Sequence, residues 1–310
     1  MSTYANWDQT DPLEERISFS NVARRPRWQL PAGQRVAVWV VPNIEHYEYL
    51  PVEVRVRDPW PRMPYPDVHG YGGRDYGNRV GLWRMMEVLD KYGLRCTVSL
   101  SMAVLRMYPR IFEAMEERDW EYMSHGLYNT RYVWGYSEEE ERRLIQQCVR
   151  MHEDLTGRPL KGWFSPAVSC TPFTPDLVAE AGIEFYCDLY HDDQPTPVAT
   201  RSGPLISVPY SMDLNDAMIY RQPVEGAEFA QMIMDHFDTV YQEGELQPRV
   251  MCIALHPYMM GAPHRIRHLD RALAYIAGHE GVWFATGGEI AAWYRDHGMA
   301  QYQQHLGKEA

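Results

Sequence analysis

The 310-residue sequence contains few cysteines, no long apolar run and no excess of basic side chains. Its five cysteines are widely spaced and include no Cys-x-x-Cys pair, which excludes a disulfide-stapled domain and a zinc ribbon. No segment approaches the roughly 18 consecutive apolar residues of a membrane-spanning helix, and the first residues lack the basic and apolar parts of a secretion signal. The formal net charge of −12 argues against binding to nucleic acid or an anionic membrane. We therefore expect a cytoplasmic protein with reduced thiols.

The overall composition is typical of a folded globular protein, with 45% hydrophobic and 23% charged residues. Short apolar runs alternate with longer segments of helical period from about residue 35 onward. The runs predict strands at 35–41, 96–100, 121–124, 162–165, 185–189, 205–210, 250–255 and 282–286. The helical segments lie at 78–92, 137–155, 177–181, 229–241, 269–276 and 289–295.

The alternation of strands and helices predicts an α/β fold with parallel strands and helical crossovers. The first strand is not followed by a Gly-rich phosphate loop, which favours a barrel over an open doubly wound sheet. We expect one barrel domain over residues 35–297, with an N-terminal arm at 1–34 and a C-terminal tail at 298–310. The Pro-, Tyr- and Gly-rich segment 50–77 is expected to be an irregular insertion that serves as a lid or a subunit contact.

Polar side chains follow most of the predicted strands. Because the C-terminal ends of parallel barrel strands meet on one face, where such enzymes place their active sites, these side chains are expected to converge. Four of the strand ends carry a histidine. The strand-end residues are Asn43, Glu45, His46, Glu48, His125, Asn129, Ser169, His191, Asp192, Asp193, Asp213, Asn215, Asp216 and His256.

Several segments resemble a known family. EYMSHGLYNTRYVW, which contains His125, resembles the NodB-type polysaccharide deacetylase signature with its Ser-His-Gly run. IALHPYMMGAPH and VWFATGGEIAAWY resemble the closing part of the same superfamily. The Asn43-Ile44-Glu45 pattern after the first strand resembles its allantoinase-like, metal-independent branch. The resemblance covers residues 35–295 and implies a distorted (β/α)7-type barrel that hydrolyses a non-peptide carbon–nitrogen bond.

The sequence departs from the pattern of the metal-dependent members of that superfamily. Those members have a paired Asp at the end of strand one, where this chain has Val41 and Pro42. They have a second His four residues after the first, where this chain has Asn129, and an Arg where it has Phe164. We therefore expect either no cofactor or a weakly held divalent metal, with zinc as the first candidate and with His125 and Glu45 as its ligands.

Three residues are candidates for catalysis. His256 is predicted to be the general acid that protonates the leaving nitrogen, because imidazole titrates near the operating pH. Glu45 and His125 are the alternatives for activating water, and the sequence leaves open which of them is the base. Side chains near the expected barrel mouth are predicted to bind substrate: Asn43, Asn129, Trp163, Phe164, Asp192, Tyr210, Asn215 and Tyr258.

The function predicted from these residues is hydrolysis of a small amide, cyclic amide or imide, or ureide. The alternatives are a metal-dependent N-deacetylase of a sugar or peptidoglycan fragment, and an inactive barrel that serves as a binding scaffold. The apolar side chains Trp7, Trp28, Trp60 and Tyr65 in the arm and the insertion predict a homo-oligomer, either a dimer or a tetramer.

Overall fold

The structure is a computed structural model that describes residues 16–52, 66–217 and 224–309. Trp7, Trp60 and Tyr65, on which the predicted oligomer partly depends, lie outside these residues. Trp28 is described and is buried against Tyr294 of the same chain, with the two ring centroids 5.4 Å apart. Trp28 therefore needs no partner subunit to cover it.

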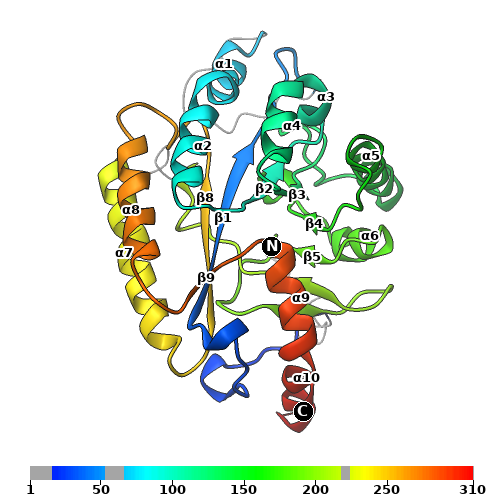
Figure 1. Cartoon of the computed structure of the whole chain (residues 1–310). Helices are drawn as coiled ribbons and strands as arrows, with labels where there is room; N and C mark the ends of the chain where they lie inside the picture. Colours follow the sequence, from blue (N-terminus) through cyan, green and yellow to red (C-terminus); the bar gives the residue numbers. More distant parts are fainter. Residues whose placement is uncertain (1–15, 53–65, 218–223, 310) are drawn as a thin grey trace, which may run out of the picture.

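The strands form one curled, mostly parallel sheet, the distorted α/β barrel that the sequence predicts (Figure 1). Their order is β6-β7-β5-β4-β3-β2-β1-β8, and β9 pairs with the first residues of β1. A bridge between Asn215 and Ala254 links β8 to the segment that follows β7. The strands are β1 Val36–Ile44, β2 Thr97–Leu100, β3 Glu121–Ser124, β4 Gly162–Trp163, β5 Phe185–Tyr186, β6 Thr196–Val198, β7 Leu205–Ser207, β8 Arg249–Leu255 and β9 Val282–Phe284.

Helices cover the outside of this sheet. α7 and α8 pack side by side on one flank, and α5 and α6 lie on the opposite flank (Figure 1). The helices are α1 Val68–Tyr76, α2 Leu82–Lys91, α3 Ala103–Met107, α4 Pro109–Glu116, α5 Glu138–Thr156, α6 Thr174–Glu180, α7 Gly226–Glu243, α8 Ile266–Ala277, α9 Gly287–His297 and α10 Met299–Glu309. None of the described helices is long and apolar enough to cross a membrane.

Alternation along the strands separates two apolar cores. Val36, Val38 and Val40 of β1 belong to the core between sheet and helices, whereas Ala37 and Trp39 point into the barrel. Successive side chains of a strand face opposite sides, so an apolar run without polar gaps fits a sheet that is covered on both faces. This is why residues 36–41 of β1 are all apolar.

The structure corrects several predicted elements. Residues 68–76, assigned to an irregular insertion, form α1, and the predicted tail forms α10. α3, α4 and the antiparallel strand β6 are not in the prediction. The α1 sequence contains three glycines and lacks a clear apolar stripe, so the periodicity of its side chains gives no helix signal.

α1 continues directly into a π-helical turn, η3, over Gly77–Gly81. A Cβ at Gly81 would lie 2.0 Å from the carbonyl oxygen of Pro257, and one at Gly77 would lie 2.8 Å from the backbone nitrogen of Tyr258. Only glycine permits this approach of two backbones. The turn therefore holds α1 against the segment that follows β8.

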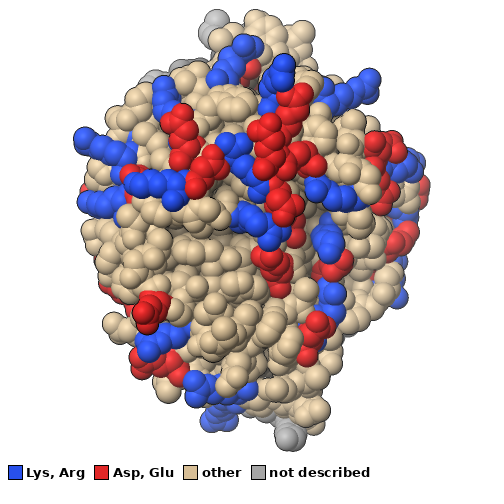
Figure 2. All heavy atoms as spheres, in the orientation of Figure 1, with Lys and Arg blue, Asp and Glu red and all other residues tan. Residues whose placement is uncertain are grey.

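Acidic and basic side chains alternate over the face of the molecule that Figure 2 shows. Several form ion pairs between neighbouring elements, such as Arg118 with Asp90 and Arg95 with Glu289. On this face the described residues form no continuous band of one sign.

Candidate active site

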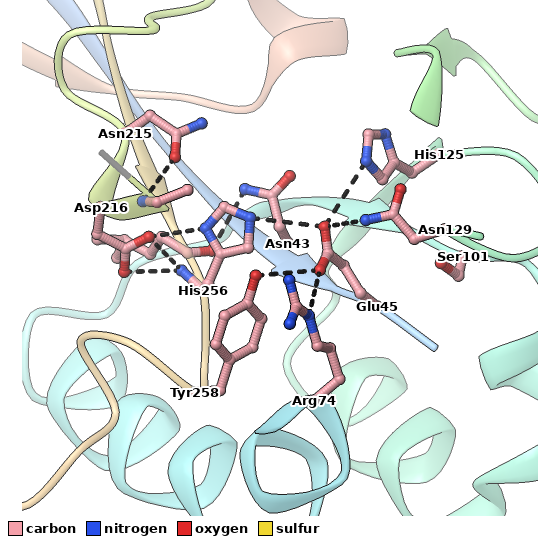
Figure 3. Close-up of polar contacts among 12 residues, drawn as sticks. Asn43, Glu45, Arg74, Ser101, His125, Asn129, Asn215, Asp216, His256 and Tyr258 are labelled. Atoms are coloured by element: carbon pink, nitrogen blue, oxygen red, sulfur yellow. Dashed lines mark hydrogen bonds and ion pairs between the residues drawn. The ribbon is translucent and has the colours of Figure 1, made fainter. Parts of the chain in front are cut away.

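Glu45 lies at the centre of the polar side chains at the C-terminal end of the sheet (Figure 3). It follows β1 directly and is buried. One carboxylate oxygen, Oε1, lies 3.5 Å from Nε2 of His256 and 3.8 Å from Nε2 of His125. Two imidazoles therefore face one carboxylate from different strands, β8 and β3.

Asp216 fixes the orientation of His256. The Nδ1 atom of His256 lies 2.7 Å from Oδ1 of Asp216, and the backbone N–H of His256 donates to both oxygens of the same carboxylate at 2.8 and 2.9 Å. The backbone N–H of Met260 also donates to Asp216, at 3.2 Å. This arrangement places the proton of Nδ1 toward Asp216 and directs Nε2 toward Glu45.

His125 is held by Phe164, the residue that follows β4. Its Nδ1 atom lies 2.9 Å from the carbonyl oxygen of Phe164, which can only accept, so Nδ1 carries a proton. The Phe164 ring stacks on the imidazole, with centroids 4.9 Å apart and planes at 18°. The chain turns away at Gly126, whose φ of +69° is a conformation that favours glycine.

Charge in this buried cluster shifts two pKa values in opposite directions. Burial favours the neutral form of Glu45, but His256, Arg74 and His125 together outweigh it and lower the pKa of Glu45 to about 2. Burial also favours neutral His256, yet Glu45 and Asp216 raise the pKa of His256 to about 9. At neutral pH the pair is therefore a carboxylate beside an imidazolium.

Three further side chains surround Glu45. Asn129 donates from its amide nitrogen to Oε1, and the Tyr258 hydroxyl donates to Oε2 at 3.2 Å. The Nε atom of Arg74 lies 3.7 Å from Oε2, and its guanidinium lies between the rings of Tyr47 and Tyr258 at 4.0 and 4.5 Å. The buried Oδ1 atom of Asn129 has no hydrogen-bond partner within the described residues.

A second polar group lies beside His256. Asn43 donates to the Tyr210 hydroxyl at 3.2 Å and to the carbonyl of Leu255 at 3.3 Å. Asn215 donates to the same hydroxyl at 3.3 Å. The Tyr210 ring packs on Phe164, with centroids 4.3 Å apart, so this group is continuous with the residues that hold His125.

Two of the residues predicted to bind substrate lie elsewhere. Trp163, the last residue of β4, is fully buried in the core outside the barrel, because it and the next residue, Phe164, point in opposite directions. Asp192 forms a bidentate ion pair with Arg25, and the neighbouring Gln194 donates to the carbonyl of Pro248 just before β8 begins. Asp192 therefore lies at the opposite end of the barrel from His256.

Two residues of the site were given no role on the sequence. Asp216 is one of the strand-end acids, but the residue predicted to bind substrate at this strand end is its neighbour Asn215. Arg74 lies in the segment that was expected to be irregular, and nothing in its sequence places it near Glu45. The position of Asp216, after a strand and before a buried loop, is the sequence signal that could indicate its role.

The donor set does not fit a divalent metal. Across 16–52, 66–217 and 224–309, no group of three or more His, Cys, Asp or Glu side chains is arranged to hold one. Val41 and Pro42 offer no ligand, and Asn129 turns its amide nitrogen, a hydrogen-bond donor, toward Glu45. With the cationic Arg74 beside the same carboxylate, hydrogen-bond donors and positive charge surround the oxygens that a metal would need.

Comparisons with known proteins show which family the chain resembles. The family model for polysaccharide deacetylases matches residues 74–186. A Schizosaccharomyces pombe protein described as a polysaccharide deacetylase is 30% identical over 260 residues, which cover 77% of this chain and 80% of that protein. The chain belongs to the polysaccharide deacetylase family. A peptidoglycan deacetylase of Helicobacter pylori is 24% identical over 264 residues, which cover 71% of this chain and 89% of that protein.

Solved structures place this polysaccharide deacetylase family member near allantoinase-like relatives. The crystal structure of PuuE allantoinase has a TM-score of 0.81 and 26% identity, and the match covers 88% of this chain and 95% of that one. A probable polysaccharide deacetylase from Pseudomonas aeruginosa has a TM-score of 0.78 and 28% identity, with 87% and 95% covered. The protein is thus a hydrolase of carbon–nitrogen bonds other than peptide bonds, and the predicted family resemblance is confirmed.

Proposed function

We propose that this protein hydrolyses a small amide, cyclic amide or imide, or ureide, in a reaction like that of an allantoinase. The observation that carries the proposal is the position of the Glu45 carboxylate between the Nε2 atoms of two buried imidazoles, at 3.5 and 3.8 Å. Each imidazole is oriented by a different partner, Asp216 for His256 and the Phe164 carbonyl for His125. Two histidines held differently suit the two proton transfers that hydrolysis of such a bond requires.

In this proposal His256 is the general acid. Its pKa of about 9 keeps it protonated at neutral pH, so Nε2 can donate a proton to the leaving nitrogen. His125 is the general base, because the proton on Nδ1 leaves the Nε2 lone pair to accept a proton from the attacking water. As the carbon–nitrogen bond breaks, the water oxygen becomes part of the product acid and its proton remains on His125.

Glu45 is assigned an electrostatic role. A carboxylate with a pKa of about 2 is a weak base, and its oxygens already accept hydrogen bonds from Asn129 and Tyr258. Its negative charge is the main reason that His256 stays protonated, since it opposes the burial that favours the neutral imidazole. The buried Oδ1 of Asn129 is placed to accept an N–H from a substrate that carries one, as ureides and imides do.

A hydrolysis screen tests this function. Purified protein would be incubated with allantoin, cyclic imides, linear ureides and N-acetylated sugars, and release of acid would be followed by titration. We expect turnover of a ureide or imide. Turnover confined to N-acetyl sugars would favour the deacetylase alternative, for which the Helicobacter pylori relative is the supporting observation. Tight binding without turnover of any of them would favour a scaffold.

The pH profile of kcat/KM is expected to be level at neutral pH and to fall above about pH 9, because His256 then loses its proton. Replacing Asp216 by Asn removes a charge that raises this pKa, so the upper limb should move at least about one pH unit lower. The free energy of unfolding should also decrease at high pH. The raised pKa of His256 stabilises the fold below pH 6.5, and this contribution is lost as the pH rises through about 9. An upper limb that stays in place in Asp216→Asn would contradict the role of His256.

Metal removal should leave activity unchanged. We expect the purified protein to hold metal substoichiometrically or not at all, because Arg74 and the Asn129 amide occupy the surroundings of Glu45. Elemental analysis and activity before and after EDTA provide the measurement. One tightly held zinc per chain, with activity lost on stripping and restored on adding zinc, would show that His125 and Glu45 are metal ligands.

The same proposal includes the organisation of the chain. Residues 35–297 form the catalytic barrel, with an arm at 1–34 and a C-terminal segment at 298–310. We propose a cytoplasmic homo-oligomer that acts on a small substrate. Exposed apolar side chains of the described residues, among them Tyr76 of α1, Val80 of η3 and Trp83 of α2, support a subunit contact there.

A further inference from the structure

The peptide group between Phe164 and Ser165 is hydrogen-bonded at both ends. Its carbonyl accepts from Nδ1 of His125 at 2.9 Å. Its N–H donates to Oδ1 of Asp188 at 2.6 Å. A buried carboxylate is thus connected to the imidazole of the proposed base through a single peptide unit.

Asp188 takes the place of a strand carbonyl at this point. β4 and β5 are parallel, with Trp163 opposite Tyr186, and the ladder ends where Cys187 donates to the carbonyl of Trp163. Continued in the same register, Ser165 would lie opposite Asp188. The side chain of Asp188 therefore accepts the N–H that the sheet no longer pairs.

Burial disfavours the ionised form of Asp188. It is 4% exposed, and burial raises its pKa to about 6 although Ser165 and the Tyr186 hydroxyl favour the ionised form. Its second oxygen, Oδ2, is buried and has no hydrogen-bond partner in the part of the chain that the structure describes. A neutral acceptor such as Asn could satisfy the Ser165 N–H equally well, so the charge itself calls for an explanation.

We propose that Asp188 is a positioning residue for His125, acting through the Phe164–Ser165 peptide group. This inference rests on the proposed function, in which His125 is the base. A carboxylate that accepts the peptide N–H polarises the peptide and makes its carbonyl a stronger acceptor. The carbonyl then holds the proton of His125 on Nδ1 and leaves Nε2 directed at the reacting water.

The contrast with His256 explains why the connection is indirect. His256 has a carboxylate in direct contact, which raises its pKa and keeps it protonated, as a general acid requires. His125 already has the Glu45 carboxylate 3.8 Å from Nε2, and on its Nδ1 side it meets a neutral carbonyl instead of a second carboxylate. A carboxylate placed one peptide unit away orients the His125 ring and acts on its charge only at a distance.

The experiment compares wild type with Asp188→Asn and Asp188→Ala. Protein carrying 15N-labelled histidine would be studied by NMR, with the His125 signals assigned from their loss in His125→Gln. We expect the Nδ1–H tautomer to dominate in wild type and to lose population in Asp188→Asn, and more so in Asp188→Ala. On the substrate found in the screen, kcat should fall about 10- to 100-fold in Asp188→Asn with KM nearly unchanged, the usual effect of removing such a supporting group.

Glu121→Gln is the matched control. Glu121 is also a buried carboxyl, held by the Gly288 N–H at 2.9 Å and Thr97 Oγ1 at 2.8 Å, but it lies at the first residue of β3, the other end of the strand from His125. Its replacement makes the same change from carboxyl to amide and should leave the His125 tautomer and kcat unchanged. Urea unfolding should show Asp188→Asn to be at least as stable as wild type at neutral pH, because the fold disfavours the ionised form.

The outcomes separate this inference from the proposed function. A shifted tautomer in a stable Asp188→Asn supports it, whether or not a substrate is known. An unchanged tautomer, or a loss of kcat matched by a loss of folded protein, overturns it. If wild type hydrolyses nothing in the screen, the proposed function fails, and the NMR result still decides whether Asp188 orients His125. Should Asp188→Ala not fold, the Asn variant alone decides.

Discussion

His256→Ala is expected to lower kcat by about 10²–10⁴-fold, the usual effect of losing a positioned general acid. The structure gives His256 both the charge and the direction for this role, since Asp216 fixes Nδ1 and Nε2 faces Glu45 at 3.5 Å. A substrate with an activated leaving group, which needs no protonation, should lose much less. Steady-state rates on the two substrates provide the measurement.

The control for His256→Ala has to separate chemistry from folding. Removal of the imidazolium leaves Glu45 and Asp216 as buried carboxylates, so we also expect a loss of stability of about 3–5 kcal/mol. His256→Gln keeps a donor at this place, and rates are to be divided by the folded fraction of each variant. His191→Ala, which removes a histidine that contacts Thr196 instead, should keep its turnover. Equal rates for His256→Ala and wild type would remove His256 from the mechanism.

Glu45→Gln should reduce kcat at neutral pH by up to about 10-fold, and by more at higher pH, for an electrostatic reason. Without the Glu45 carboxylate only Asp216 opposes the effect of burial, so the pKa of His256 falls from about 9 by about 1–3 units and less of the acid is protonated. The upper limb of the pH profile should therefore move to lower pH along with the loss of rate. Rates measured between pH 5 and 10 test both parts.

Glu48→Gln is the matched control for Glu45→Gln. Glu48 lies three residues further along the same segment and pairs with Arg131 at 2.8 Å instead of with the two histidines. Its loss should leave the pH profile of turnover in place. If added formate restored the turnover of a smaller Glu45→Ala variant without moving the pH limb, Glu45 would be the base and the role assigned to His125 would be wrong.

The part of this site that could be predicted follows from one rule. Parallel strands bring their C-terminal ends together, so a Glu after β1, a His after β3 and a His after β8 can be expected to meet although they are far apart in the sequence. Glu45, His125 and His256 do meet, with Asn43, Asn129, Phe164, Tyr210, Asn215 and Tyr258 around them. The rule gives their neighbourhood and says nothing of which atom faces which.

The remaining errors have local physical causes. Trp163 was misplaced because β4 has only two residues, and a shift of one residue turns a side chain to the other face. Asp192 was misplaced because the chain returns to the start of β8 after β5, a path that Gln194 fixes and no periodicity reveals. Arg74 comes from a glycine-rich helix whose position depends on backbone contact. Asp188 was visible only as a charge within the apolar run FYCDL.

The close contact between η3 and the backbone after β8 requires a residue without a side chain at position 81. The electrostatics of the site depend on this contact, because it sets the distance of Arg74 from Glu45. A methyl group at Gly81 would have to push the helix away from the Pro257 carbonyl, and Arg74 moves with that helix. The guanidinium would then withdraw from Glu45, although no charged residue has changed. Substitutions meant to change the activity of this hydrolase should therefore be made among the side chains around Glu45. Residues 77 and 81 should stay glycine in any active variant.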